Sequence, residues 1–237
     1  MLISVHLPKT AGTSFRHSLA EHYGEKMLLR YGERPLGLPE FERHKLVTDA
    51  AIKLSEIDYQ NIECIHGHFL PFQYLLLRSY KNLTFVTWMR NPVDRLISNY
   101  HHIKNYHKQY SSSFHHRVIE ENWPLEQYCL SEEMRNIYTQ FLWAFPLENF
   151  DFIGITEYYE KDFIFFRERY LKKEIPVRKL NVNPDKKANY QISKSLRKKI
   201  ETYHAKDMAL YERALQKRGD RHSQFHVTKK FLFWKSH

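Results

Sequence analysis

The sequence predicts an α/β fold in which helices cover both faces of a central parallel sheet. Short apolar runs alternate along the chain with longer segments whose apolar residues recur at helical spacing. The two clearest runs, residues 2–7 and 83–89, each end in a polar turn that leads directly into a helical pattern. Strands that alternate with helices in this way form parallel sheets, because each crossover helix returns the chain to the end of the sheet at which the previous strand began.

Four strands are expected, at residues 2–7, 63–66, 83–89 and 151–155. Each is followed by a segment whose apolar stripe marks one face of a helix. The four stripes are Phe15, Leu19 and Tyr23; Phe72, Leu75 and Leu76, which follow Pro71; Val93, Leu96, Ile97, Tyr100 and Ile103; and Tyr159, Phe163, Phe166 and Tyr170.

Two further helices are expected outside this alternation, the first capped by Ser131 and the second, a long one, by Ser193. Their stripes are Met134, Ile137, Phe141 and Leu142 in the first, and Leu196, Ile200, Tyr203, Leu210, Tyr211 and Ala214 in the second. Gly219 is expected to end the long helix as its C-cap. The tail that begins at about residue 219 is basic and aromatic, and we expect Phe231, Phe233 and Trp234 to pack on the domain.

The bulk composition favours one domain that spans residues 1–237. Hydrophobic residues make up 42% of the chain and aromatic residues 15%, which is ample for a core. Lysine and arginine number 37 against 27 acidic residues, so the formal net charge is +10. This excess favours an anionic partner such as a phosphorylated cofactor, an acidic polysaccharide, nucleic acid or an anionic membrane.

Several kinds of site are not expected. The two cysteines, Cys64 and Cys129, lack the spacing of a disulfide framework or a zinc site. The histidines between residues 101 and 116 carry no HExxH pattern, so no metal site is expected. We also expect no leader and no transmembrane segment, since the apolar runs are far shorter than ~18 residues, and the cytoplasm is then the simplest compartment.

The turn after the first strand reads Pro-Lys-Thr-Ala-Gly-Thr-Ser, and it predicts a site for a phosphate-type anion. Backbone N–H groups at a helix start lack intrahelical partners and bind anions. Gly12 permits a close backbone approach, Thr13 and Ser14 supply hydroxyls, and Lys9 supplies a full charge. The pattern is neither the Walker loop GxxxxGK[ST] nor GxGxxG. An ordinary capped turn with a solvated lysine is the alternative interpretation.

A second anion site is expected after the strand at residues 83–89. Arg90 stands at the carboxyl end of that strand, where open α/β sheets bind ligands. Pro92 is expected to start the next helix, and Ser98 lies about two turns into it. The apolar stripe of this helix is expected to leave Ser98, Asp94 and Arg95 on other sides. A guanidinium and a hydroxyl together can hold a phosphate-like group.

Taken together, PKTAGTSF and RNPVDRLISNY resemble the cofactor motifs of sulfotransferases that use 3′-phosphoadenosine 5′-phosphosulfate (PAPS). The closer resemblance is to the branch of the heparan and chondroitin sulfate O-sulfotransferases and their bacterial relatives. It implies a P-loop-like three-layer fold with the parallel sheet at its centre. It also implies that Lys9, Thr10, Ala11, Gly12, Thr13 and Ser14 hold the 5′-phosphosulfate, and that Arg90 and Ser98 hold the 3′-phosphate. Lys187 is a further candidate for a cofactor contact.

His66-Gly67-His68 is similar to the histidine pair of the uronyl 2-O-sulfotransferases, in which a histidine is the general base. Between the two we favour His68, because Gly67 separates it from the strand end and leaves room to face a cleft; His66 is the second choice. The resemblance implies in-line transfer of the sulfuryl group of PAPS to a hydroxyl acceptor, which we expect to be a carbohydrate. Lys9 would then stabilise the charge on the leaving oxygen.

Two other function classes remain as alternatives. A nucleotide-dependent phosphotransferase would explain an anion loop, but the Walker pattern is missing and no carboxylate suited to Mg²⁺ is evident near the loop. A nucleic-acid-binding module rests on the net charge alone and leaves the turn at Lys9 unexplained, so no nucleic-acid partner is expected.

Overall fold

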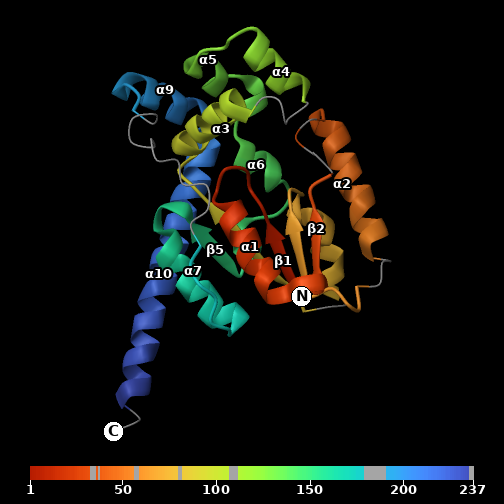
Figure 1. The fold of residues 1–237 in the computed structure, drawn as a ribbon, viewed down its shortest axis with the longest axis vertical. Helices are drawn as coiled ribbons and strands as arrows, with labels where there is room; N and C mark the ends of the chain where they lie inside the picture. The colour runs from red at the N-terminus through yellow and green to blue at the C-terminus, as the bar shows by residue number, and fades with distance from the viewer. Residues whose placement is uncertain are drawn as a thin grey trace.

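The computed structural model describes residues 1–32, 36, 38–55, 59–79, 82–106, 112–178 and 191–234. Within these ranges five strands form one parallel sheet, in the order β2-β3-β1-β4-β5 (Figure 1). The strands are β1 (Leu2–Val5), β2 (Met27–Arg30), β3 (Cys64–Gly67), β4 (Thr84–Met89) and β5 (Phe152–Ile155).

Helices cover both faces of the sheet, which confirms the predicted α/β class with three layers. On one face lie α1 (Gly12–Tyr23) and α7 (Tyr159–Phe166), in front of the sheet in Figure 1. The other face carries α2 (Glu40–Ser55), η3 (Pro71–Ser79), α6 (Ile137–Phe141) and α10 (Ala205–Trp234). Alternation along β1 explains the two cores, because Leu2 packs with the first set and Ile3 and Val5 with the second.

A third apolar cluster lies beyond the carboxyl ends of the strands, at the top of Figure 1. It joins α3 (Pro92–Tyr106), α4 (Ser113–Glu120), α5 (Leu125–Cys129) and α9 (Lys194–Tyr203). The remaining short helices are η1 (Gly24–Lys26), η5 (Glu132–Met134), η6 (Leu147–Asn149), η7 (Thr156–Tyr158) and η8 (Arg167–Leu171). Within the described residues, no helix combines the length and the apolar character needed to cross a membrane.

All four predicted strands and the helices that follow β1, β4 and β5 are confirmed. One strand and one α-helix between α1 and β3 were not predicted, namely β2 and α2. Strand β2 has only four residues, Met-Leu-Leu-Arg, and none of them is β-branched. Helix α2 interleaves its apolar residues with charged ones, and only part of its surface packs against η3 and the sheet.

The stripe predicted after Pro71 is wrong in one position. The segment is a 3₁₀-helix, in which side chains three apart share a face. Pro71, Tyr74 and Leu77 therefore share a buried face, Gln73 is buried as well, and Leu76 is 46% exposed.

Both helices predicted outside the alternation are interrupted. The one after Ser131 breaks where Asn136 adopts a left-handed backbone conformation, with φ of 50°. Ser193 caps its helix as predicted, since its Oγ accepts from the Leu196 N–H at 3.1 Å, but the helix ends at Tyr203. The His204 ring explains the second break, because it bonds the Cys129 carbonyl at 2.7 Å and the Asn136 N–H at 3.2 Å.

Gly219 does not cap the long helix, which is also a correction. Helix α10 runs through it to Trp234, passing beside β5 and on beyond the sheet (Figure 1). Lys187 and the side chains of Phe231, Phe233 and Trp234 lie outside the described residues, so those predictions stay predictions.

Candidate functional site

The turn between β1 and α1 has an unusual backbone. Lys9 and Ala11 both adopt left-handed conformations, with φ of 65° and 67°. This region is costly for residues with a Cβ atom, and such strain clusters at functional sites. Ala11 is the N-cap of α1 and makes no side-chain capping hydrogen bond. The helix thus begins without the usual side-chain oxygen that would compete with an anion for its N–H groups.

The hydroxyl residues of the turn differ in their roles. Thr10 is buried, and its Oγ1 donates to the Leu7 carbonyl at 2.7 Å, which closes the turn. Ser14 is buried at the start of α1, whereas Thr13 is half-buried.

Gly12 is required by a close approach to a side chain. A Cβ atom on Gly12 would lie 1.6 Å from Nε2 of His6, far inside any van der Waals contact. We expected the glycine to admit a ligand. Within the protein it admits the His6 ring, which is the first functional candidate that the sequence reasoning missed.

Lys9 and Arg90 are brought together at the carboxyl edge of the sheet, where β1 and β4 are neighbours. Burial, together with the charge of Arg90, lowers the pKa of Lys9 to about 8. Arg90 itself is only 8% exposed. An anion bound beside Lys9 and Arg90 would offset the repulsion between their charges.

The backbone of Arg90 is fixed by Tyr138 of α6. The Tyr138 hydroxyl donates to the Arg90 carbonyl at 2.8 Å and accepts from the Arg90 N–H at 3.1 Å. The Tyr138 N–H in turn donates to the buried carboxylate of Asp207, at 2.9 Å. Hydrogen bonds thus connect α10 through α6 to the backbone of Arg90, and they fix the position of that residue.

Helix α3 begins as an ordinary capped helix. Oδ1 of Asn91 accepts from the N–H groups of Val93 and Asp94, at 3.0 and 3.3 Å. Asp94 forms a part-buried ion pair with Arg197 at 3.0 Å, which connects α3 to α9. Arg95 is a correction, because it is 1% exposed and packs over the Tyr138 ring.

Ser98 lies half-buried two turns into α3. His102 follows four residues later and therefore lies on the same side of the helix. Burial lowers the pKa of His102 to about 4, and the charges of Lys9 and His115 act in the same direction. Because the charge of Lys9 helps to lower the pKa of His102, this side of α3 faces the β1–α1 turn.

Three histidine rings stack at the carboxyl ends of β1 and β3. His6 lies between the other two, with ring centroids 4.3 Å from His68 and 5.2 Å from His66. The parallel register explains the arrangement, since Ser4 pairs with His66 and Val5 with Gly67, so His6 and His68 follow side by side. A Cβ atom on Gly67 would lie 1.8 Å from the Arg30 carbonyl oxygen, so β2 also requires that glycine.

The hydrogen-bond partners separate His68 from His66. Nδ1 of His68 lies 2.5 Å from the His6 carbonyl oxygen, which only accepts, so Nδ1 carries the proton and Nε2 carries the lone pair. His66 is 1% exposed, its Nδ1 bonds Ser4 Oγ at 2.8 Å, and its Nε2 has no partner among the described residues. Burial lowers the pKa of His66 to about 3 and also lowers the pKa of the half-buried His68.

Tyr31, which follows β2, joins the stack from a third strand. Its hydroxyl lies 2.8 Å from Nδ1 of His6, and it also takes part in a hydrogen bond with the Arg16 side chain. Burial raises the pKa of Tyr31 to about 12, against the opposing effect of Arg16, so the phenol keeps its proton. His6 directly follows β1 and Tyr31 directly follows β2, so a search for polar residues at strand ends could have found both. Arg16 lies within α1, and no such signal marks it.

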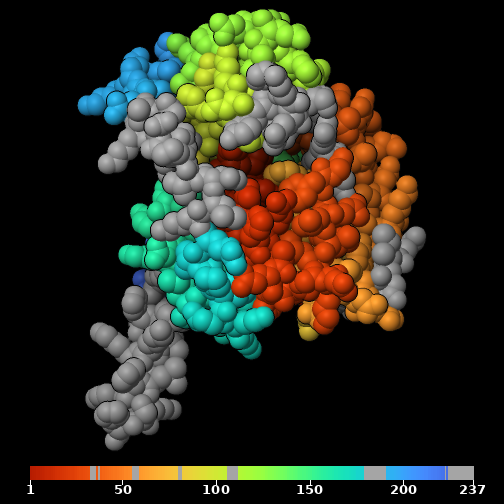
Figure 2. Space-filling model, viewed as in Figure 1, coloured from red at the N-terminus to blue at the C-terminus, as the bar shows by residue number. Residues whose placement is uncertain are grey.

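The cationic side chains of the site are Lys9, Arg16 and Arg90, whereas the lowered pKa values of His66 and His68 leave those rings neutral. Burial lowers the pKa of His6, and the charges of Arg16 and Lys9 act in the same direction. In the space-filling view, the start of the chain is visible in a depression between α1, α2 and α3 (Figure 2). Among the described residues, no three His, Cys, Asp or Glu side chains converge as they would around a metal ion.

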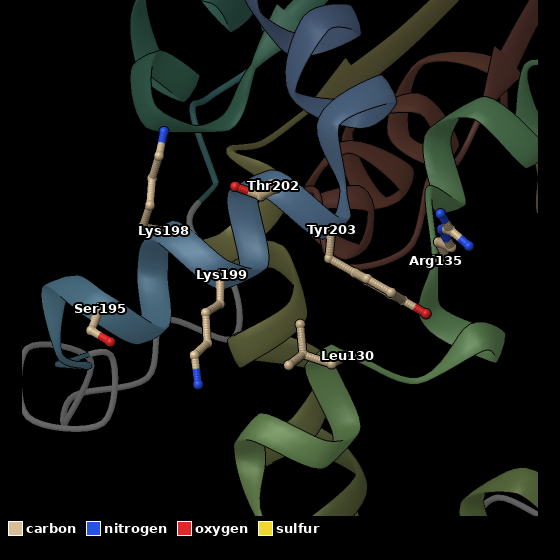
Figure 3. Close-up of a pocket in the computed structure, with 7 residues that line it drawn as sticks. All are labelled: Leu130, Arg135, Ser195, Lys198, Lys199, Thr202 and Tyr203. Atoms are coloured by element: carbon tan, nitrogen blue, oxygen red, sulfur yellow. The ribbon is translucent and has the colours of Figure 1, made fainter.

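A separate groove of about 660 Å³ lies between α9 and the α5–η5 segment (Figure 3). Two of its basic residues have acidic partners, since Lys199 bonds Glu126 at 2.9 Å and Arg135 bonds Glu132 at 3.2 Å. Lys198 and Lys199 also point away from each other. This groove contains none of the residues of the β1–α1 turn.

No protein-family model matches the chain, and no curated protein matches it significantly. Among solved structures, the chain is similar to a sulfotransferase from Alicyclobacillus acidocaldarius, with 18% identity over 91% of this chain and 95% of that one and a TM-score of 0.49. It is also similar to mouse sulfotransferase SULT7A1 complexed with PAP, with 13% identity over 80% of this chain and 62% of that one and a TM-score of 0.43. Both likenesses are distant.

Proposed function

We propose that this chain is a single-domain sulfotransferase that transfers the sulfuryl group of PAPS to a hydroxyl acceptor, expected to be a carbohydrate. The observation that carries the proposal is the meeting of Lys9 and Arg90 beside a helix start without a side-chain cap. PAPS carries anionic groups at two positions, a 5′-phosphosulfate and a 3′-phosphate. A backbone cradle and a separate guanidinium fit such a molecule better than they fit a single phosphate.

The donor supplies an activated sulfuryl group, and the residues of this chain bind and orient it. Residues 9–14 would hold the 5′-phosphosulfate, with Lys9 beside the bridging oxygen. Arg90 and Ser98 would hold the 3′-phosphate. Lys9 would neutralise the negative charge that grows on the bridging oxygen as its bond to sulfur breaks. The partly buried position of Lys9 strengthens this interaction, because fewer water molecules screen it.

His68 is the general base in this proposal. Its Nε2 lone pair is set by the Nδ1–H bond to the His6 carbonyl, and it would take the proton of the acceptor hydroxyl as the new oxygen–sulfur bond forms. Such a base typically contributes about 10²- to 10⁴-fold in rate. His66 is the weaker choice, since it is buried and its Nδ1 bonds Ser4.

The test begins with binding. We expect 3′-phosphoadenosine 5′-phosphate to raise the thermal midpoint, and neither ATP with Mg²⁺ nor single-stranded DNA to do so to the same extent. Labelled PAPS is then assayed against a panel of glycans and small alcohols, with the Lys9→Ala variant as the control. Stabilisation by ATP with Mg²⁺ but not by the bisphosphate would overturn the proposal in favour of a phosphotransferase.

A further inference from the structure

His6 contacts both the histidine pair and the anion turn of the candidate site. Its ring stacks on both His66 and His68, and its Nε2 faces Gly12 of the anion turn. Its backbone N–H donates to the Gly67 carbonyl at 2.8 Å, and its own carbonyl accepts from His68 at 2.5 Å. His6 therefore contacts the strand of the base and the turn of the anion at the same time.

Hydrogen bonds connect His6 to helix α1. The Tyr31 hydroxyl and Nδ1 of His6 lie 2.8 Å apart and share a hydrogen bond, and the Arg16 guanidinium, which only donates, interacts with the same Tyr31 hydroxyl. The other ring nitrogen of His6, Nε2, faces Gly12. Arg16 lies four residues after Gly12 on α1, so the chain of bonds returns to the helix that the anion turn begins.

We propose that His6 is a positioning residue, which holds the His68 ring in place and connects it through Tyr31 and Arg16 to the start of α1. This inference rests on the proposed role of His68 as the base. The physical reason is geometric. Nε2 of His68 must face the acceptor hydroxyl, and a flat ring stacked on its face restricts the rotation that would turn Nε2 away. A displacement of about 1 Å at a reacting atom can cost roughly 10²-fold in rate.

Three variants test the role of His6. His6→Leu removes the ring and its nitrogens. His6→Asn keeps a polar atom near the position of Nδ1 that can accept from Tyr31. Tyr31→Phe removes the hydroxyl from the other side of the same bond. The bisphosphate Kd and the thermal midpoint of each variant are measured beside kcat, so that loss of the cofactor site or of the fold is recognised.

We expect His6→Leu to lower kcat at least about tenfold while the bisphosphate Kd changes less than about threefold. His6→Asn should recover most of this loss. Tyr31→Phe should lower kcat as well. The kcat of the double variant His6→Leu/Tyr31→Phe should be no lower than that of the poorer single variant, because both substitutions remove the same hydrogen bond. Additive losses in the double variant, or an unchanged kcat in His6→Leu, would overturn the inference.

Nuclear magnetic resonance of the imidazole nitrogens gives a readout that does not need activity. Wild-type His68 should show one tautomer, protonated at Nδ1, with signals assigned through the His68→Gln variant. In His6→Leu we expect the two tautomers to mix and the pKa of His68 to rise toward about 6.5, since water reaches the loosened ring. A single unchanged tautomer and pKa would overturn the inference. Retained transfer activity in His68→Gln would instead overturn the proposed base, so the two failures are distinct.

Discussion

The two strand-to-helix turns at the carboxyl edge of the sheet have the same topology but opposite chemistry. At β4–α3, the Asn91 side chain caps the helix and accepts from two of its first N–H groups. At β1–α1, the N-cap is a left-handed alanine whose side chain cannot accept a hydrogen bond. The β4–α3 turn thus supplies a hydrogen-bond acceptor for the first N–H groups of α3. The N-cap of the β1–α1 turn supplies none for the first N–H groups of α1.

This difference shows how each turn can bind an anion. The β1–α1 turn can offer backbone N–H groups together with Lys9. In the β4–α3 turn, the Asn91 side chain already accepts from two of the first N–H groups of α3. Anion binding by this turn must therefore come from the side chains of Arg90 and Ser98. Of these two turns, only the one whose backbone is the candidate ligand is strained, since Lys9 and Ala11 have positive φ and none of residues 90–98 does.

The largest effect that separates the two turns is expected from Lys9→Ala. Loss of the only full charge in the β1–α1 turn should lower kcat for sulfuryl transfer by about 10²- to 10³-fold or more, because the leaving oxygen loses its positive partner. The thermal midpoint of the free protein should not fall, since Lys9 is held in an unfavourable, partly buried position. Near wild-type turnover in this variant would contradict the assignment.

Substitutions in the β4–α3 turn should act on binding rather than on turnover. Arg90→Ala should weaken the bisphosphate by about 10- to 100-fold, as expected for hydrogen bonds to a charged group. Ser98→Ala removes a neutral hydroxyl and should cost about two- to tenfold. Calorimetric titration measures both, and Ser113→Ala, on the neighbouring helix α4, is a matched control. A larger loss of kcat than of affinity would show that the β4–α3 turn acts on turnover and not only on binding.

The pKa of Lys9 predicts a pH dependence that the other turn does not share. Burial lowers this pKa to about 8, and a bound anion favours the charged form and raises it again. Above pH 8 the free protein has lost this proton and the complex has not, so binding should take up about one proton at pH 9 and weaken as the pH rises. Calorimetry in buffers of different ionisation enthalpy measures the uptake, which should vanish in Lys9→Met.

The smallest effects concern the two caps. Asn91→Ala should destabilise the protein by about 1 kcal/mol, because the start of α3 loses its side-chain partner. Ala11→Gly should instead stabilise it, by up to about 1 kcal/mol, because glycine adopts the left-handed conformation without the Cβ clash. Urea unfolding of both variants measures these differences. Equal destabilisation by the two substitutions would mean that the turns are held in the same way.

Much of this fold could be predicted from the sequence because its periodicities are strong. The strand at 84–89 and the stripe of Val93, Leu96 and Ile97 indicate their elements without tertiary information. Elements were missed or misjudged where tertiary contacts outweighed the local pattern. The His204 side chain bonds two other segments where we expected one continuous helix, and β2 is held by pairing with β3 although its residues are not typical of a strand.

The sequence by itself determined that a glycine-containing turn with a lysine follows the first strand and that an arginine follows a central one. These are local facts, set by the order of residues along each strand-to-helix connection. Only the tertiary structure decided that β1 and β4 lie side by side, which brings Lys9 within reach of the charge of Arg90. Strand register likewise decided that His6 stacks on His68, because residues that are distant in the sequence become neighbours only when their strands pair.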